Sequence, residues 1–304
     1  MTILVLGGRG KTAHRLAAIL STTAPEIPFL VASRTISPTS TYKQAQFDWL
    51  DESTWAQPFT MASASPSLRN SAAGGASPIT AVYIVAPPVL DMVPPMKNFI
   101  DFARGQGAKR FVLLSASSFE RGGPAMGQVH DYLAQLGENR EKGGGGIEWA
   151  VLRPTWFMEN ISESQHLPSI KGERKIYSAT GEGRVPFISA DDIARVAFRA
   201  LTDARPHNTE HIILGPELLS YDDVAEILSS ILASKITHVK LSEAEFASRL
   251  ESNFGLSAEY TQMLAGLETS IKNGAEDRMN DVVERITGKA PKKFRDCVEA
   301  SDFV

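Results

Sequence analysis

The sequence has almost no cysteine. Cys297 is the only one in 304 residues, which excludes a disulfide framework and a cysteine-rich metal site. Histidines are also few, and those after residue 160 lack the spacing of metal ligands. They are His166, His207, His211 and His238. We therefore expect no bound metal.

Long apolar runs and a strong charge imbalance are missing as well. No run approaches the roughly 20 apolar residues of a membrane helix, and a strand predicted from residue 3 leaves no room for a signal peptide. Lys and Arg number 31 against 35 Asp and Glu, a formal net charge of −4, which does not favour a polyanion-binding surface. We expect a cytoplasmic protein that binds neither membrane nor nucleic acid.

What the sequence does have is a glycine motif at its start. An apolar run at 3–6 is followed by GGRGKTA at 7–13 and then by a segment with helical periodicity. Strand, G-x-x-G-x-x-A turn and helix together are typical of dinucleotide binding. Gly7 would make the turn, and Gly10 would let the backbone approach a pyrophosphate at the helix N-terminus. The alternative is a turn in which the glycines have only a structural role.

The end of the second apolar run, 28–32, indicates which nicotinamide cofactor is bound. Ser33 and Arg34 follow it. An acidic residue at this point takes the ribose 2′-hydroxyl of NAD, whereas a basic residue accommodates the 2′-phosphate of NADP. Arg34, with Arg9 and Lys11 in the glycine loop, therefore favours NADPH. The alternative is that Arg34 is a solvated loop arginine.

Further apolar runs alternate with helical patterns through the first half of the chain. Strands are predicted at 46–49, 80–86, 110–116 and 148–154, and helices at 91–107 and 125–136. This alternation predicts an α/β, Rossmann-like fold with a doubly wound parallel sheet. Residues 61–77 are predicted to form a surface loop and residues 143–146 a turn.

The pattern changes after Pro154, and we predict a boundary there. Residues 1–155 are expected to form the NADP-binding domain. Residues 156–304 are expected to form a smaller, mostly helical substrate lobe, with a late strand near 211–214 that returns to the sheet.

The carboxyl ends of parallel strands line the ligand crevice in such folds. Asp48 is expected at the adenine amino group, Trp49 over the adenine ring and Ser115 on the nicotinamide side. The predicted cofactor-binding residues are Gly7, Gly8, Arg9, Gly10, Lys11, Thr12, Ser33, Arg34, Asp48, Trp49, Ala86, Pro87, Pro88, Ser115, Ala116 and Pro154.

Several of these stretches resemble a known family. Gly7-x-x-Gly10-x-x-Ala13, Ser33-Arg34 and Leu114-Ser115-Ala116 resemble the NmrA-like, atypical short-chain dehydrogenases. A closer resemblance is to the fungal festuclavine/agroclavine dehydrogenases of ergot alkaloid biosynthesis. It is carried by residues 2–12, 47–50, 111–117, 152–160, 186–195 and 214–221, and it weakens after about Leu256. Its most specific part is the stretch from Arg153 to Asn160.

The resemblance implies NADPH-dependent reduction of a cyclic iminium. This iminium forms from chanoclavine-I aldehyde by intramolecular condensation of its secondary amine, after an Old Yellow Enzyme-type partner has acted on the double bond. The product would be festuclavine or agroclavine. Because fold alone does not decide function, two alternatives stay open. One is an NmrA-type sensor that binds NADP(H) and regulates a partner without turnover, and the other is a quinone or enone reductase.

The chain departs from alcohol and ketone dehydrogenases at the proton donor. Their Tyr-x-x-x-Lys pair is missing, since the corresponding helix carries Met126 to His130, and Tyr132 is followed four residues later by Leu136. Hydride addition to C=N⁺ gives a neutral amine and needs no proton, so this absence is consistent with an iminium substrate. No catalytic residue is certain; the candidates are Ser115, His130 and Tyr132.

Aromatic side chains of the same regions are candidates to hold the cationic substrate by cation–π contacts. The predicted substrate residues are Met126, His130, Tyr132, Trp156, Phe157, Met158 and Asn160. The alternatives are that His130 is a satisfied helix histidine and that residues 156–158 belong to the core.

Overall fold

The chain is described by a computed structural model that covers residues 1–64, 78–141 and 146–301. It divides into two compact units. The first comprises Met1–Arg153 and Ile193–Ile212, and the second comprises Pro154–Asp192 and Ile213–Val304. The sequence predicts a boundary after residue 155 and a late strand near 211–214 that returns to the sheet. In the structure the chain crosses between the units three times, because most of the helix at 190–202 and most of the strand at 209–213 belong to the first unit.

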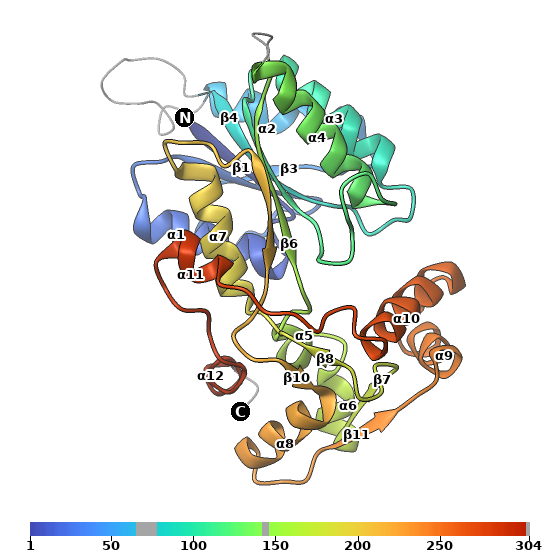
Figure 1. Ribbon diagram of the computed structural model, residues 1–304. Helices are drawn as coiled ribbons and strands as arrows, with labels where there is room; N and C mark the ends of the chain where they lie inside the picture. The colour runs from blue at the N-terminus through green and yellow to red at the C-terminus, as the bar shows by residue number, and fades with distance from the viewer. Residues whose placement is uncertain (65–77, 142–145, 302–304) are drawn as a thin grey trace. The chain divides into compact units, whose positions relative to one another are not determined.

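A seven-stranded sheet forms the centre of the first unit (Figure 1). Its order is β3-β2-β1-β4-β5-β6-β9, and the pairings from β3 across to β6 are all parallel. The strands are β1 (Thr2–Leu6), β2 (Phe29–Ser33), β3 (Gln44–Gln46), β4 (Ile79–Val85), β5 (Arg110–Leu114), β6 (Glu148–Pro154) and β9 (Thr209–Ile213). The strand order reverses between β1 and β4, which confirms the predicted Rossmann-like, doubly wound fold.

Helices cover both faces of this sheet, so its central strands are apolar throughout. All five residues of β1 are buried. On one face, Phe99 of α3 and Val129 of α4 belong to the same core cluster as Phe111. On the other face, the buried Tyr83 hydroxyl donates to Thr12 Oγ1 of α1 at 3.0 Å. The helices are α1 (Lys11–Thr23), the 3-10 turn η1 (Glu52–Thr54), α2 (Ala56–Ala64), α3 (Val93–Gly105), α4 (Met126–Glu141) and α7 (Ala190–Thr202).

The third strand ends earlier than the sequence predicts. Instead of 46–49 it spans Gln44–Gln46. The amide of Asp48 donates to Thr54 Oγ1 at 2.9 Å, and the Asp48 carbonyl accepts the Trp55 indole N–H at 2.9 Å. These bonds turn the chain into η1 and away from the sheet.

The predicted loop at 61–77 is wrong at its start. Residues 61–64 complete helix α2, because Phe59 and Ala62 bury one side of that helix. Residues 65–77 and most of the turn predicted at 143–146 lie outside the residues that the structure describes.

The second unit contains two small sheets and several helices (Figure 1). Strands β7 and β11 pair in parallel, and β8 and β10 pair antiparallel. The strands are β7 (Lys175–Ser178), β8 (Arg184–Val185), β10 (Leu219–Ser220) and β11 (Thr237–Lys240). The helices are α5 (Glu159–Ser162), α6 (Leu167–Glu173), α8 (Tyr221–Ile231), α9 (Glu243–Phe254), α10 (Ala258–Lys272), α11 (Val282–Thr287) and α12 (Phe294–Glu299). Within the described ranges no helix has the length and apolar character needed to cross a membrane.

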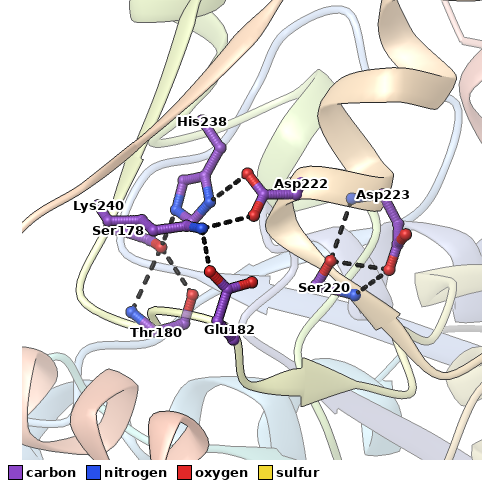
Figure 2. A network of polar contacts seen from close by, with 8 residues as sticks. All are labelled: Ser178, Thr180, Glu182, Ser220, Asp222, Asp223, His238 and Lys240. Atoms are coloured by element: carbon purple, nitrogen blue, oxygen red, sulfur yellow. Dashed lines mark hydrogen bonds and ion pairs between the residues drawn. The ribbon is translucent and has the colours of Figure 1, made fainter.

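A polar network joins β7, β11 and α8 within the second unit (Figure 2). Ser178 Oγ lies 2.7 Å from His238 Nε2, and His238 Nδ1 lies 3.1 Å from Asp222 Oδ1. This order of groups also occurs in hydrolase triads. Here, however, Ser178 is 0% exposed and shares its hydroxyl with Thr180 Oγ1 at 2.7 Å. The network therefore joins secondary-structure elements and offers no accessible nucleophile.

A buried carboxyl in the second unit should make the stability of the protein depend on pH. Glu268 of α10 is 3% exposed, and its Oε2 accepts the amide of Ala179 at 2.7 Å. Burial raises the pKa of the Glu268 carboxyl to about 8. The folded protein therefore keeps a proton that the unfolded chain loses at lower pH, so the free energy of unfolding should fall as pH rises toward about 8.

We expect Glu268→Gln to remove this fall, because glutamine keeps the acceptor for Ala179 and carries no charge. Each pKa unit corresponds to about 1.4 kcal/mol. Above a pH of about 8, the free energy of unfolding of Glu268→Gln should therefore exceed that of wild type by an amount on the order of a few kcal/mol. This difference should vanish as the pH falls toward about 4.5. Urea unfolding across that range measures it. Glu259→Gln, at an exposed position of the same helix, is the matched control. An unchanged pH profile in Glu268→Gln would contradict the assignment.

Candidate functional site

A cavity of about 730 Å³ opens at the carboxyl ends of β1, β2 and β4 in the first unit. Its lining residues are Gly7, Arg9, Gly10, Ala32, Ser33, Arg34, Thr35, Phe47, Asp48, Trp49, Leu50, Val85, Ala86, Pro87, Pro88 and Val89. Ten of these are among the predicted cofactor residues. The others, such as Thr35 and Leu50, are close neighbours of predicted residues in the sequence, and that adjacency is the signal that could have found them.

The glycine turn leaves the start of α1 open toward this cavity. Gly7 has a φ of +69°, and a Cβ there would lie 2.9 Å from Val85 Cβ, so only glycine fits. The amide of Gly10 donates to Gly7 O at 2.7 Å. Gly10 is the N-cap of α1 and supplies no capping side chain. The first amides of α1 and the positive end of its dipole thus suit an anion such as a pyrophosphate.

Three other residues of the motif, which were also predicted to bind the cofactor, do not line this cavity. A Cβ on Gly8 would lie 2.2 Å from Val31 Cγ1, so this glycine serves the packing of the turn against β2. The Thr12 hydroxyl is buried and accepts from Tyr83. Lys11 does not line the cavity, and its carbonyl accepts from Arg15. This arrangement does not support a cofactor contact for the side chain of Thr12.

Two arginines flank one end of the cavity, next to the end of β2. Arg34 is exposed, and Arg9 Nη1 donates to Thr35 Oγ1 at 2.9 Å. Ser33 Oγ donates to the carbonyl of Thr35 at 2.7 Å. The hydroxyl proton of Ser33 is therefore already donated to Thr35, and the guanidinium groups are the donors best placed for a 2′-phosphate.

The two side chains predicted to contact adenine both line the cavity, but they differ in exposure. Asp48 is half-buried at the cavity wall and holds its own loop, since Oδ1 accepts the amide of Leu50 at 3.0 Å. Trp49 is only 8% exposed, donates its indole N–H to Val85 O at 3.1 Å and packs edge-on against Phe99. Trp49 is thus mainly a core residue. Leu50, 67% exposed, is the apolar side chain available at the rim.

The remaining predicted cofactor residues lie at other places. Ala86, Pro87 and Pro88 line the cavity, whereas Ser115, Ala116 and Pro154 do not. Pro154 is buried and belongs to the second unit. Ser115 is 5% exposed, and its hydroxyl has no hydrogen-bond partner among the described residues.

The candidates on α4 do not form a proton-donating pair. The Tyr132 hydroxyl donates to Asp101 Oδ2 of α3 at 2.6 Å, and burial together with that carboxylate raises its pKa to about 12. His130 is 1% exposed and packs against Trp149; burial lowers its pKa. Met126 packs against the core cluster. The contact with Asp101 gives no support to the prediction that Tyr132 faces a substrate.

The predicted substrate residues beyond Pro154 all belong to the second unit. Met158 is 1% exposed and is a core residue, so its burial gives no support to the predicted substrate contact. Trp156 packs against the same core, Phe157 bridges to Ile188, and Asn160 is half-buried.

A second cavity, of about 560 Å³, lies within this unit between α6 and α9. Arg249 lies 3.6 Å over the ring of Tyr177 there, and both side chains contact Glu173. None of the predicted substrate residues lines it. Over the part of the chain that is described, no group of His, Cys, Asp and Glu is arranged to hold a metal ion.

No family model matches the chain. It is 49% identical to festuclavine synthase II of Penicillium roqueforti, over 100% of this chain and 99% of that protein. It is 44% identical to agroclavine dehydrogenase of Claviceps fusiformis, over 98% and 96% of the two chains. In structure it is similar to the triphenylmethane reductase of Citrobacter sp. in complex with NADP(H), with a TM-score of 0.74 and 16% identity over 99% and 100% of the chains. The chain therefore belongs to the festuclavine/agroclavine dehydrogenase family, which confirms the resemblance seen in its sequence.

Proposed function

We propose that this protein is an NADPH-dependent reductase that transfers hydride to a cyclic iminium derived from chanoclavine-I aldehyde, giving festuclavine or agroclavine. The observation that carries the proposal is the cavity lined by the glycine turn and by two arginines, Arg9 of that turn and Arg34 after β2. It occurs in a chain 44% to 49% identical to agroclavine and festuclavine dehydrogenases.

The residues of this cavity fit the parts of NADPH. Gly7 makes the turn against Val85, and Gly10, an N-cap without a side chain, leaves the start of α1 open for the pyrophosphate. Arg34 and Arg9 are donors for the 2′-phosphate, and they distinguish NADPH from NADH. Asp48 and Leu50 lie where the adenine would extend from that ribose. The bound cofactor supplies the hydride, while the protein orients it and excludes water.

The chemistry of α4 favours an iminium over a carbonyl substrate. A ketone becomes an alkoxide on hydride addition and needs an acid, whereas a C=N⁺ group takes a hydride and becomes a neutral amine. Burial lowers the pKa of His130, so this side chain is neutral near pH 7. Tyr132 is bonded to Asp101 and has a pKa of about 12. Neither side chain is therefore a suitable general acid at neutral pH.

The test is the single-turnover decay of NADPH absorbance against a stable N-alkyl iminium. We expect reduction at a rate that is nearly flat with pH. His130→Ala and Tyr132→Phe should each slow this step by less than about tenfold, although general acid catalysis contributes about 10²–10⁴-fold where it operates. A ketone of matched shape is the control substrate and should react far more slowly.

A thousandfold loss in either variant, or a bell-shaped pH profile of the hydride step, would point to a carbonyl or enone substrate. Tight NADPH binding without turnover of any imine would favour the sensor alternative. The preceding step at the double bond is assigned to an Old Yellow Enzyme-type partner. A coupled assay with both proteins should convert the aldehyde where either protein alone does not.

A further inference from the structure

Two largely buried arginine side chains lie at opposite ends of the neighbouring strands β5 and β6. At the amino ends, Arg110 pairs with Glu148 at 2.6 Å and donates to the carbonyls of Leu201 and Asp203 at 2.9 and 2.8 Å. At the carboxyl ends, Arg153 pairs with Glu210 of β9 at 2.5 Å. The two ion pairs have similar N···O distances, but only the second lies at the edge where parallel strands bind ligands.

Arg153 also fixes the chain that leaves β5. Its Nη2 donates to the carbonyl of Ser117 at 2.8 Å. The side chain of Arg153 is 5% exposed and that of Glu210 is 39% exposed, so the buried charge is compensated from a partly solvated partner. Charge-assisted bonds to a planar guanidinium are strong and directional. The position of residues 115–117 therefore depends on Arg153.

That segment carries a buried hydroxyl that has no internal partner. The β5–β6 pairing continues to Leu114 and Leu152, and the amide of Ser115 donates to Leu152 O at 2.7 Å. Ser115 and Arg153 thus occupy the next row, on one face of the sheet. Ser115 Oγ and Arg153 Nε are both buried without a hydrogen-bond partner among the described residues. Since buried polar groups are nearly always bonded, these two atoms point to a ligand at this edge.

We propose that Arg153, held by Glu210, is a positioning residue that fixes residues 115–117 so that the Ser115 hydroxyl meets the nicotinamide half of the bound cofactor. This inference rests on the proposed function, because it takes NADPH as the ligand of the first unit. Arg153 itself does not touch the reacting atoms. Its effect is exerted through the loop that it holds.

The experiment compares Arg153→Met with Arg110→Met, which removes the ion pair at the amino ends of β5 and β6. The first readout is the emission of protein-bound NADPH, which reports the surroundings of the nicotinamide without turnover. The second is the single-turnover hydride rate. We expect Arg153→Met to change the emission and to slow hydride transfer by about a hundredfold, the size of effect that misplacement by about 1 Å produces. The dissociation constant of NADPH should hardly change, since the adenosine end is untouched.

Arg110→Met should lose stability but keep the emission and the hydride rate of wild type. Glu210→Gln keeps the guanidinium and its bond to Ser117, so it should change the emission and the hydride rate in the same direction as Arg153→Met, but less. It replaces Arg153→Met in the comparison if that variant does not fold. The proposal is overturned if the two arginine variants change emission and rate alike, or if neither does. Altered emission in Arg153→Met alone, in a protein that reduces no imine, would support the positioning role and reject the proposed substrate.

Discussion

Gly10→Val is expected to abolish NADPH binding while the fold survives. Gly10 has φ −79° and ψ 156°, an extended conformation that valine adopts readily. Its Cβ would lie 3.1 Å from Gly7 O, so a small shift accommodates it, but the two methyl groups would occupy the space for the pyrophosphate. If two charge-assisted bonds to the start of α1 are lost at roughly 1.5–3 kcal/mol each, affinity falls by more than about a hundredfold. Isothermal titration and circular dichroism measure the two properties.

Gly8→Ala is the matched control for this variant. Its Cβ would lie 2.2 Å from Val31 Cγ1, and valine side chains are too stiff to move aside freely. We expect a loss of about 1–3 kcal/mol in the free energy of unfolding, with NADPH still bound by the folded fraction. A folded Gly10→Val protein that kept its affinity for NADPH would mean that the loop is only a structural turn.

Arg34→Ala is expected to weaken NADPH binding by about one to two orders of magnitude. A charge-assisted hydrogen bond contributes roughly 1.5–3 kcal/mol, and Arg34 lines the cavity with an exposed guanidinium. Binding of NADH should be nearly unaffected, because it has no 2′-phosphate. Titration of both cofactors against wild type and variant measures the difference.

Arg9→Ala tests which of the two arginines contributes more to binding of the 2′-phosphate. Arg9 already donates to the Thr35 hydroxyl at 2.9 Å, so part of its hydrogen-bonding capacity is used inside the protein. Its removal should weaken NADPH binding less than removal of Arg34. Equal losses for NADPH and NADH in Arg34→Ala would refute the assignment of this residue to the 2′-phosphate.

Much of the fold was predictable because the signals are local. The apolar run, the glycine turn and the helical period of residues 3–20 act within one or two turns of chain, and the structure has β1 and α1 there. The same holds for β6, whose residues Glu148–Pro154 match the predicted strand. The ends of β1, β2 and β4 then follow from the topology of a parallel sheet, and ten of the predicted cofactor residues line one cavity as a result.

The partners of individual side chains were decided only by the tertiary structure. Thr12 is bonded by Tyr83, 71 residues away, and Trp49 bonds Val85, 36 residues away. Tyr132 donates to Asp101, 31 residues away. Each had been predicted from its own position in the sequence to contact a ligand. The sequence pattern shows that a polar group lies near a strand end, but the partner depends on which distant segment packs beside it.

The sequence by itself therefore determined the class of the fold, the place of the glycine turn and the family. The tertiary structure decided which glycine serves packing, which hydroxyl is already bonded, and that Arg153 and Glu210, 57 residues apart, form a pair at the edge of the sheet. The physical reason is the distance along the sequence over which each kind of interaction acts. Backbone preferences and periodicity act over a few residues, whereas a buried charge or hydroxyl takes its partner from any segment that the fold brings near.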